Sequence, residues 1–389
     1  MRVLFTSVPQ AGHLYPLLPL ARAFAELGDE VLVSTGVGAA SAAERAGLPV
    51  APVGTELAEW FQRLADRVRG TPGAGLPPDR IIRYFVPRLF AEIGAAATVD
   101  DLLRVCREWR PDLLVFDPFA FAGPLAAAVA GLPAVQHGLG PAPEPLTLEL
   151  AADALSPLWR SFGLDVPDYA GVFDELTLNI CPAALEPTPA PPGAPVHDLR
   201  PAAIDPPGPD GRPPDCLLGL PERSTVYATL GTFANGDLAV FRSIVDGLAT
   251  EPVNLVVTVG TGNDPADLGA VPVNARIERY VPQASLLPYC SAVIHHAGSG
   301  TMLGALAHGL PALVIPQGAD NFVNADRVVA SGAARRLLPD QVDAGAVRDN
   351  LAELLVDSCY RDRAGVVAAQ IAGMPAPVEV AADLQDRYR

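Results

Sequence analysis

The sequence predicts an α/β protein built from two Rossmann-like domains that face a central cleft. Short apolar runs alternate with helical patterns along almost the whole chain, which is typical of βαβ units and parallel sheets. A proline-rich segment separates two such alternations. The 389 residues are too many for one compact domain and suit two domains of about 150–200 residues each.

Four strands are predicted in the first half of the chain, over residues 3–8, 31–36, 112–117 and 133–136. Residues 10–15 are expected to form a loop, and an alanine-rich helix is expected after Pro118. Pro16 to Leu27 is expected to be a helix, because Pro16 suits a first turn and apolar residues recur on one face. These apolar residues are Leu17, Leu20, Phe24 and Leu27.

Residues 182–214 contain twelve prolines, and such a segment is expected to be an extended linker that continues no sheet. The second alternation has predicted strands over residues 224–231, 254–260, 276–281, 292–296 and 312–316. We therefore expect a first domain over residues 1–200, a linker over 201–222 and a second domain over 223–370. Residues 371–389 are expected to form a helix that packs back on the first domain.

Composition narrows the class of partner. The net charge is −17 and the pI about 4.7, which argues against binding to nucleic acid or an anionic membrane. Five cysteines lie far apart without a C-x-x-C pair, as in a reduced cytoplasmic protein with no zinc site. Prolines and glycines interrupt the apolar N-terminal run and residues 118–135, so neither a signal peptide nor stable membrane insertion is expected.

The stretch HHAGSGT (295–301) lies where a predicted strand turns into a helix. Free N–H groups and the helix dipole make such a position a phosphate site. Gly298 and Gly300 allow close approach to the backbone, and Ser299 and Thr301 add hydroxyl donors. The stretch matches neither the ATPase P-loop nor the dinucleotide fingerprint. The alternative is an ordinary capped turn.

Gly12 and His13 follow the first predicted strand, and Asp117 ends the strand over 112–117. The Gly12-His13 pair and Asp117 therefore lie at carboxyl ends of strands, where ligands bind in parallel sheets. A carboxylate next to an imidazole fixes its tautomer and raises its basicity, as a general base requires. The alternative is a structural or merely exposed histidine.

These segments together resemble the UDP-glycosyltransferase superfamily, whose fold is called GT-B, and especially the bacterial enzymes that decorate secondary metabolites. Residues 279–328 resemble the donor-binding signature of that family, and residues 12–16, 113–117 and 229–232 resemble its other elements. The resemblance implies an inverting, metal-independent glycosyltransferase, and the sequence lacks a D-x-D metal clamp. It implies no cofactor; the co-substrate is a nucleoside-diphosphate sugar, and the partners are that donor and a hydrophobic acceptor.

The resemblance also implies roles for individual residues. His13 matches the catalytic base and Asp117 its orienting partner. Matching positions for the donor are Thr232, His296, Gly298, Ser299, Gly300 and Thr301 for the diphosphate, Tyr280, Val281, Pro282 and Gln283 for the nucleobase and ribose, and Asp320 and Asn321 for the sugar. A cationic or donating His296 is expected to stabilise the leaving diphosphate. His295 and His308 are expected to do no chemistry.

Three departures from the family pattern bear on the donor. Tyr280 stands where many members have a tryptophan that stacks on uracil. Gly304 stands where UDP-sugar enzymes commonly have a glutamate for the ribose hydroxyls. Asn321 is one methylene shorter than the usual glutamine. Together these departures favour a dTDP-deoxysugar over a UDP-hexose.

The acceptor side is less specific. Aromatic residues between 57 and 95 shape an apolar acceptor site in this family, or else they pack under a long loop. The predicted acceptor residues are Gly12, Trp60, Phe61, Tyr84, Phe85 and His137. Rival interpretations are a lipid-linked sugar transferase, a nucleotide-sugar epimerase that needs no acceptor, and a non-catalytic partner protein. A homodimer is also compatible with the sequence.

Overall fold

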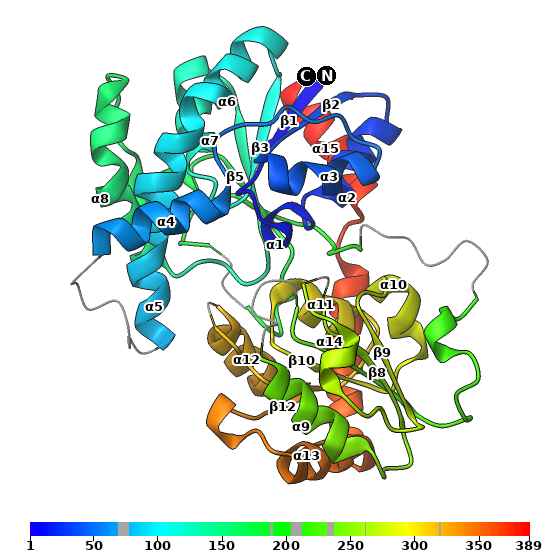
Figure 1. Ribbon diagram of the computed structural model, residues 1–389. Coiled ribbons are helices and arrows are strands. Elements are labelled where there is room, and N and C mark those ends of the chain that lie inside the picture. The colour runs from blue at the N-terminus through cyan, green and yellow to red at the C-terminus, as the bar shows by residue number, and fades with distance from the viewer. Residues whose placement is uncertain (69–77, 187–189, 204–211, 232–236, 261, 319) are drawn as a thin grey trace. The chain divides into compact units, whose positions relative to one another are not determined.

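The structure, a computed structural model, describes residues 1–389 except 69–77, 187–189, 204–211, 232–236, 261 and 319 (Figure 1). The chain forms two compact units. Unit 1 comprises Met1–Cys181, Thr188–Ile204 and Met374–Arg389, and unit 2 comprises Pro182–Pro187 and Asp205–Gly373. Each unit contains one six-stranded parallel sheet, as the alternation of strands and helices predicts.

The sheet of unit 1 has the strand order β2-β1-β3-β4-β5-β6. Its strands are β1 (Arg2–Thr6), β2 (Glu30–Ser34), β3 (Leu113–Phe116), β4 (Ala134–His137), β5 (Leu176–Asn179) and β6 (Val196–Asp198). Every residue of β3 is buried, because helices cover both faces of a parallel sheet and its central strands are apolar throughout. The carboxyl ends of the neighbouring strands β1 and β3 meet where Thr6 pairs with Phe116.

The helices of unit 1 include a π-helix as well as α-helices. They are α1 (Ala11–Leu14), α2 (Leu18–Glu26), α3 (Val37–Arg45), α4 (Leu57–Val68), α5 (Pro78–Phe85), the π-helix η1 (Val86–Ala95), α6 (Ala96–Trp109), α7 (Ala122–Ala130), α8 (Pro145–Ser161) and α15 (Pro377–Tyr388), together with the short 3₁₀ turn η2 (Asp168–Gly171). A π-helix is rare and is frequently found at functional sites. Here it contacts α4, α5, α6 and α8.

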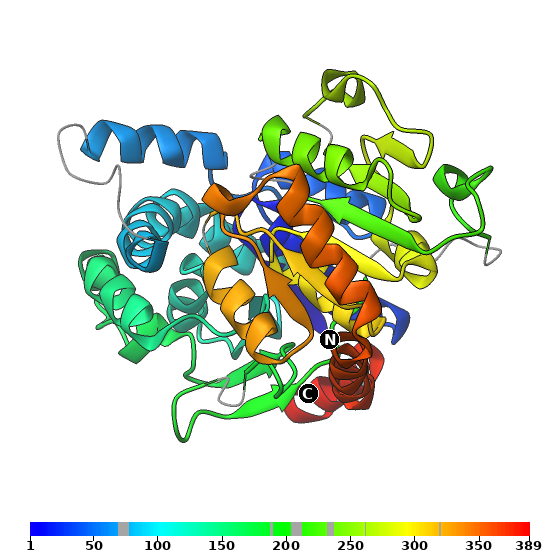
Figure 2. The same ribbon diagram turned by 90° about the horizontal axis from the view of Figure 1, so that it is seen from below.

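The sheet of unit 2 has the strand order β12-β11-β10-β7-β8-β9. Its strands are β7 (Thr225–Thr229), β8 (Asn254–Thr258), β9 (Ala275–Glu278), β10 (Ala292–His295), β11 (Ala312–Val314) and β12 (Ala334–Arg336). Its helices are α9 (Leu238–Leu248), α10 (Gln283–Leu286), α11 (Ser299–Ala307), α12 (Asn321–Ala330), α13 (Ala344–Val356) and α14 (Ser358–Gly373). In Figure 2 the orange helix α13 crosses in front of this sheet, and it contacts α9, β11 and β12.

The predicted strands are confirmed to within a few residues, and two local predictions are wrong. Residues 11–14 form the short helix α1 rather than part of a loop. The proline-rich segment also contributes a strand, because β6 pairs with β5 at the edge of the first sheet. Proline is tolerated beside an edge strand, where one side of the backbone has no partner strand.

By length and composition, one stretch of the described residues, Ser358–Tyr388, is apolar enough to cross a membrane. The structure divides this stretch into α14, which belongs to unit 2, and α15, which belongs to unit 1. Apolar side chains of each helix are buried in its own unit, among them Val367 and Ile371 of α14 and Val380 and Leu384 of α15. These apolar residues therefore contribute to the cores of a folded protein.

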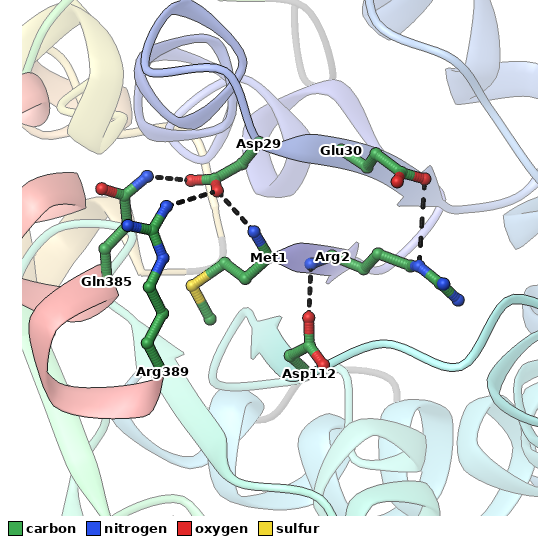
Figure 3. Close-up of polar contacts among 7 residues, drawn as sticks. All are labelled: Met1, Arg2, Asp29, Glu30, Asp112, Gln385 and Arg389. Atoms are coloured by element: carbon green, nitrogen blue, oxygen red, sulfur yellow. Dashed lines mark hydrogen bonds and ion pairs between the residues drawn. The ribbon is translucent and has the colours of Figure 1, made fainter.

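Helix α15 packs against α2, and a buried carboxylate fixes its end (Figures 1 and 3). Asp29, in the turn between α2 and β2, accepts hydrogen bonds from the Met1 ammonium at 2.7 Å and from Gln385 and Arg389 of the C-terminal segment. Burial raises the pKa of Asp29, but these donors and the charge of the ammonium outweigh burial and hold it below its usual value. Asp29 thus joins three segments of unit 1.

Candidate active site

His13 and Asp117 come together at the carboxyl edge of the first sheet. His13 lies in α1, which follows β1, and Asp117 directly follows the neighbouring strand β3. The Nδ1 atom of His13 and the Oδ1 atom of Asp117 are 3.0 Å apart. The two residues are 104 positions apart in sequence, and the parallel pairing of β1 with β3 brings them into contact.

The carboxylate of Asp117 is held by more than the histidine. It is fully buried, and it accepts the N–H of Val8 at 2.8 Å and the N–H of Phe119 at 2.9 Å. A buried carboxylate that accepts from several donors cannot rotate freely. Its bond to Nδ1 leaves Nε2 of His13 as the ring nitrogen that can accept a proton.

Aromatic rings surround the imidazole of His13. The rings of Phe90, from η1, and Phe119 each lie 5.7 Å from it, centroid to centroid. These two phenyl rings stack on each other at 5.6 Å, and Trp60 meets Phe90 edge to face at 6.4 Å. Phe119 was not predicted, although its place two residues after Asp117 is a signal that could have found it. The result is a largely apolar wall around a basic nitrogen.

Two of the predicted acceptor residues, Trp60 and His137, have buried side chains. Trp60 is 3% exposed, packs against Gly94 and donates to Thr55 Oγ1 at 3.1 Å. His137 is fully buried and donates from Nδ1 to the carbonyl of Gly138 at 2.7 Å. Burial lowers the pKa of His137 to about 4. Both residues support the fold behind the site.

The other predicted acceptor residues occupy several surfaces of unit 1. Beside the site, Gly12 has no described atom within 4 Å of the position of a Cβ atom. Phe61 is exposed on α4. Tyr84 and Phe85 meet edge to face at 5.5 Å, and Tyr84 lines a groove of about 690 Å³ between α5, η1 and α8. Phe85 packs against the same apolar cluster as Trp60, Phe90 and Phe119.

In unit 2, the chain turns sharply between β10 and α11. Ala297 has a φ of 66°, a left-handed conformation that costs a residue other than glycine about 1–2 kcal/mol. Its N–H donates to Nδ1 of the buried His295 at 3.0 Å, and its carbonyl accepts from Asn324 at 3.0 Å. Burial lowers the pKa of His295 to about 3, so this neighbour is a neutral structural acceptor.

The ring of His296 lies against two glycines. A Cβ atom on Gly231 would come within 2.5 Å of this ring, and one on Gly298 would come within 2.2 Å. Both positions therefore require glycine for packing, a reason that adds to backbone approach. Burial lowers the pKa of His296 to about 4, so the ring is a neutral donor at pH 7 rather than a cation. Thr232 lies outside the described residues.

Helix α11 begins with Ser299, Gly300 and Thr301 after the N-cap residue Gly298. The first N–H groups of a helix have no partner within the helix and carry its positive dipole end. No side chain of the described residues caps this end. Gly300 is exposed, and no described atom lies within 4 Å of where its Cβ would be. The helix start is therefore open to an anion.

The residues predicted to contact the nucleobase and ribose differ in how exposed their side chains are. Tyr280 is 54% exposed, whereas the Val281 side chain is buried in a core cluster, so a nucleobase could meet only the Val281 backbone. The Gln283 amide donates to Thr301 Oγ1 at 3.0 Å and to the buried Tyr227 hydroxyl at 3.5 Å. A Cβ atom on Gly304 would lie 3.9 Å from Gln283 Oε1, so position 304 faces Gln283.

The predicted sugar residues lie at the start of α12. Asp320 is its N-cap residue and accepts from Asn324 at 2.8 Å. Asn321 is 6% exposed, and its amide turns towards Asp320 at 3.4 Å. The Asn321 side chain is therefore largely buried rather than extended into solvent. Sequence reasoning missed Asn324, whose contacts depend on the tertiary arrangement of α12 and the loop after β10.

Two Rossmann-like units, one with a histidine–carboxylate pair and one with an open helix start behind a glycine-rich turn, define a GT-B glycosyltransferase. Comparison with known proteins agrees. Residues 82–198 match the N-terminal domain of the erythromycin biosynthesis protein CIII-like family, and residues 242–386 match its C-terminal domain. The chain belongs to this family and is a glycosyltransferase of bacterial secondary metabolism.

Individual relatives are similar over the whole chain. The elloramycin glycosyltransferase ElmGT of Streptomyces olivaceus is 34% identical, and the match covers 100% of this chain and 98% of ElmGT. The crystal structure of the glycosyltransferase SnogD from Streptomyces nogalater is 32% identical, covers 100% and 99%, and has a TM-score of 0.78. The spinosyn rhamnosyltransferase SpnG complexed with thymidine diphosphate is 27% identical, covers 99% and 100%, and has a TM-score of 0.79.

Proposed function

We propose that this enzyme transfers a deoxysugar from a dTDP-sugar to a hydrophobic natural-product acceptor, with inversion at the anomeric carbon and without a metal. Nε2 of His13 takes the proton from the acceptor nucleophile. That nucleophile forms a bond to the anomeric carbon as the bond from this carbon to the diphosphate oxygen breaks. The diphosphate leaves with the bonding electrons and is stabilised by α11.

The pairing of His13 with Asp117 carries this proposal. An imidazole held at 3.0 Å by a buried carboxylate, itself fixed by two backbone N–H groups, is oriented for one task. The carboxylate stabilises the imidazolium that forms when the acceptor loses its proton. The Phe90 and Phe119 rings beside the imidazole favour an apolar acceptor over a polar one.

The donor assignment rests on the start of α11. Its open N–H groups and the neutral His296 can bind a diphosphate and stabilise the charge that it gains on leaving. Glycine at position 304, next to Gln283, leaves no carboxylate for a 2′-hydroxyl, which agrees with a deoxyribose. The similar enzyme SpnG, complexed with thymidine diphosphate, supports the same nucleotide.

The deoxysugar assignment rests on the start of α12. Asn321 is largely buried beside Asp320, so this side chain offers little to sugar hydroxyls. A sugar that lacks a hydroxyl loses less from such a site than a fully hydroxylated hexose. Rhamnose, the sugar named for SpnG, is also a deoxysugar.

The test is mass spectrometry of reactions that combine a panel of nucleotide sugars with polycyclic and macrolide-type acceptors. We expect an acceptor mass increased by one deoxyhexosyl unit when a dTDP-deoxysugar is present, and NMR of the product should show inversion. Transfer from UDP-hexoses alone would overturn the donor assignment. Turnover of nucleotide sugar without any acceptor would indicate an epimerase instead.

A further inference from the structure

Asn324 is a buried residue of α12 that connects two parts of the donor site. The residue is only 2% exposed. Its amide nitrogen donates to the carbonyl of Ala297 at 3.0 Å, to Asp320 Oδ2 at 2.8 Å and, at a longer 3.3 Å, to Ser299 Oγ. One amide thus contacts the turn before α11, the first residue of α11 and the N-cap residue of α12.

The contact with Ala297 restrains the turn over residues 296–301, which we call the phosphate loop. Ala297 is held in a left-handed conformation, with its N–H on His295 and its carbonyl on Asn324. Removal of the Asn324 amide would release one of these two restraints. The peptide that leads into Gly298 and Ser299 could then rotate, and the open N–H groups of α11 would lose their common direction.

The contact with Asp320 restrains a carboxylate that is predicted to bind the donor sugar. The amide holds one carboxylate oxygen of Asp320 from within the same helix, four residues later. The neighbouring amide of Asn321 lies on the other oxygen at 3.4 Å. The Asn324 amide therefore orients both the Asp320 carboxylate and the phosphate loop.

We propose that Asn324 is a positioning residue that holds the phosphate loop and the Asp320 carboxylate in fixed positions relative to each other. The diphosphate and the sugar of one donor are then held at a set separation, as alignment of the anomeric carbon requires. This inference rests on the proposed function, in which these two elements bind the donor. Because Asn324 is buried, this role needs no contact of its own with the sugar or the phosphates.

The chain offers a matched control for a merely structural role. Asn274 is 5% exposed, belongs to the same unit, and donates its amide to the backbone carbonyls of Leu248 and Val253, each at 2.9 Å. Leu248 ends α9, and Val253 precedes β8, so these contacts lie at the amino ends of the strands. Asn274→Ala and Asn324→Ala therefore remove the same kind of buried amide donor, the first at the amino ends of the strands and the second at their carboxyl ends.

The experiment compares the wild type with Asn274→Ala and Asn324→Ala by calorimetry with thymidine diphosphate and, in parallel, uridine diphosphate. Thermal melting of each variant is measured without ligand. We expect both variants to melt below the wild type. Only Asn324→Ala should bind the nucleotide about 10-fold more weakly, the scale of one lost hydrogen bond. Its kcat should fall further, because the sugar is misaligned as well.

A third variant tests the hydrogen-bond donor itself. Asn324→Asp keeps the shape of the side chain but sets a carboxylate against Asp320. A protonated acid restores a donor, so its fraction of wild-type nucleotide affinity should rise as the pH falls from 8 to 6. A packing role predicts a constant fraction.

Equal affinity loss in Asn274→Ala and Asn324→Ala, or none in either, would overturn the role of Asn324. Failure of the proposed donor is distinguishable, because the wild type would then prefer uridine diphosphate while the difference between the two variants persisted. A wild type that binds neither nucleotide would overturn both proposals.

Discussion

At the scale of single residues, Gly304 is the position at which nucleotide preference can be tested. Gly304→Glu should shift binding from thymidine diphosphate towards uridine diphosphate, because the new carboxylate can accept from a ribose 2′-hydroxyl. Among the described atoms outside the backbone of its own helix, a Cβ atom there meets Leu287 Cδ1 at 3.4 Å and Gln283 Oε1 at 3.9 Å, so the backbone need not move. Titration calorimetry measures the ratio of the two affinities. A wild type that already prefers uridine diphosphate would contradict this role of Gly304.

Some residues of the site could be predicted from the sequence and others could not. His13, Asp117 and Gly300 stand beside predicted strand ends, so their positions follow from the alternation of elements alone. Phe119 carries a weaker signal, its place two residues after Asp117, and Asn324 depends on contacts across the fold. Val281 and His137 show the converse: their places at predicted strand ends do not tell that their side chains are buried.

At the scale of elements, the turn from β10 into α11 contains two glycines with different reasons to be glycine. Gly298 is enclosed by the His296 ring, whereas Gly300 faces open space in the described structure. The sequence places both in the same small-residue cluster and predicts one reason, close backbone approach. Only the packed loop reveals that one of them makes room for a protein ring.

This difference predicts opposite behaviour in two variants. Gly300→Val should leave the melting temperature of the free protein nearly unchanged and abolish its rise on addition of thymidine diphosphate. Gly298→Ala should destabilise the free protein by about 1–3 kcal/mol, because its Cβ atom overlaps the His296 ring. Thermal melting with and without the nucleotide measures both. A collapse of Gly300→Val in the free state would mean that the turn is purely structural.

Strands with a clear apolar run could be predicted from the sequence, and strands without one could not. The apolar runs that became β3, β7, β8 and β10 are strongly patterned, and each is confirmed as a strand. Strands β6 and β12 have three residues each, as β11 does, but unlike β11 they contain no apolar run that would indicate a strand. For β6, proline content indicated a linker, but a neighbouring strand with free backbone groups decided the outcome.

At the scale of the whole molecule, α15 is held on unit 1 by its packing against α2 and by one buried carboxylate, that of Asp29 (Figure 3). Asp29→Asn should lower the stability of unit 1 by roughly 3 kcal/mol at pH 7, since the Met1 ammonium and Arg389 lose their counter-charge. Asp112→Asn is the control, because its contact with the Arg2 N–H is exposed and an amide oxygen can still accept it.

The pH dependence of this difference follows from the lowered pKa of Asp29. A carboxyl with a folded pKa below the unfolded value of about 3.9 stabilises the fold above that value. The stabilisation is lost as the pH falls through the folded pKa. Denaturation curves of the wild type and Asp29→Asn should therefore differ most at neutral pH and converge under strongly acidic conditions. A constant difference across this range would show that the charge of Asp29 is irrelevant.

The proposed function assigns the catalytic base to unit 1 and nucleotide binding to unit 2. The most direct measurement is the kcat/KM of transfer by His13→Ala, together with its affinity for thymidine diphosphate. We predict a loss of about 10²–10⁴-fold in kcat/KM, the usual contribution of a general base, with the nucleotide affinity unchanged. Near-normal turnover, or an equal loss of nucleotide affinity, would contradict this assignment of His13.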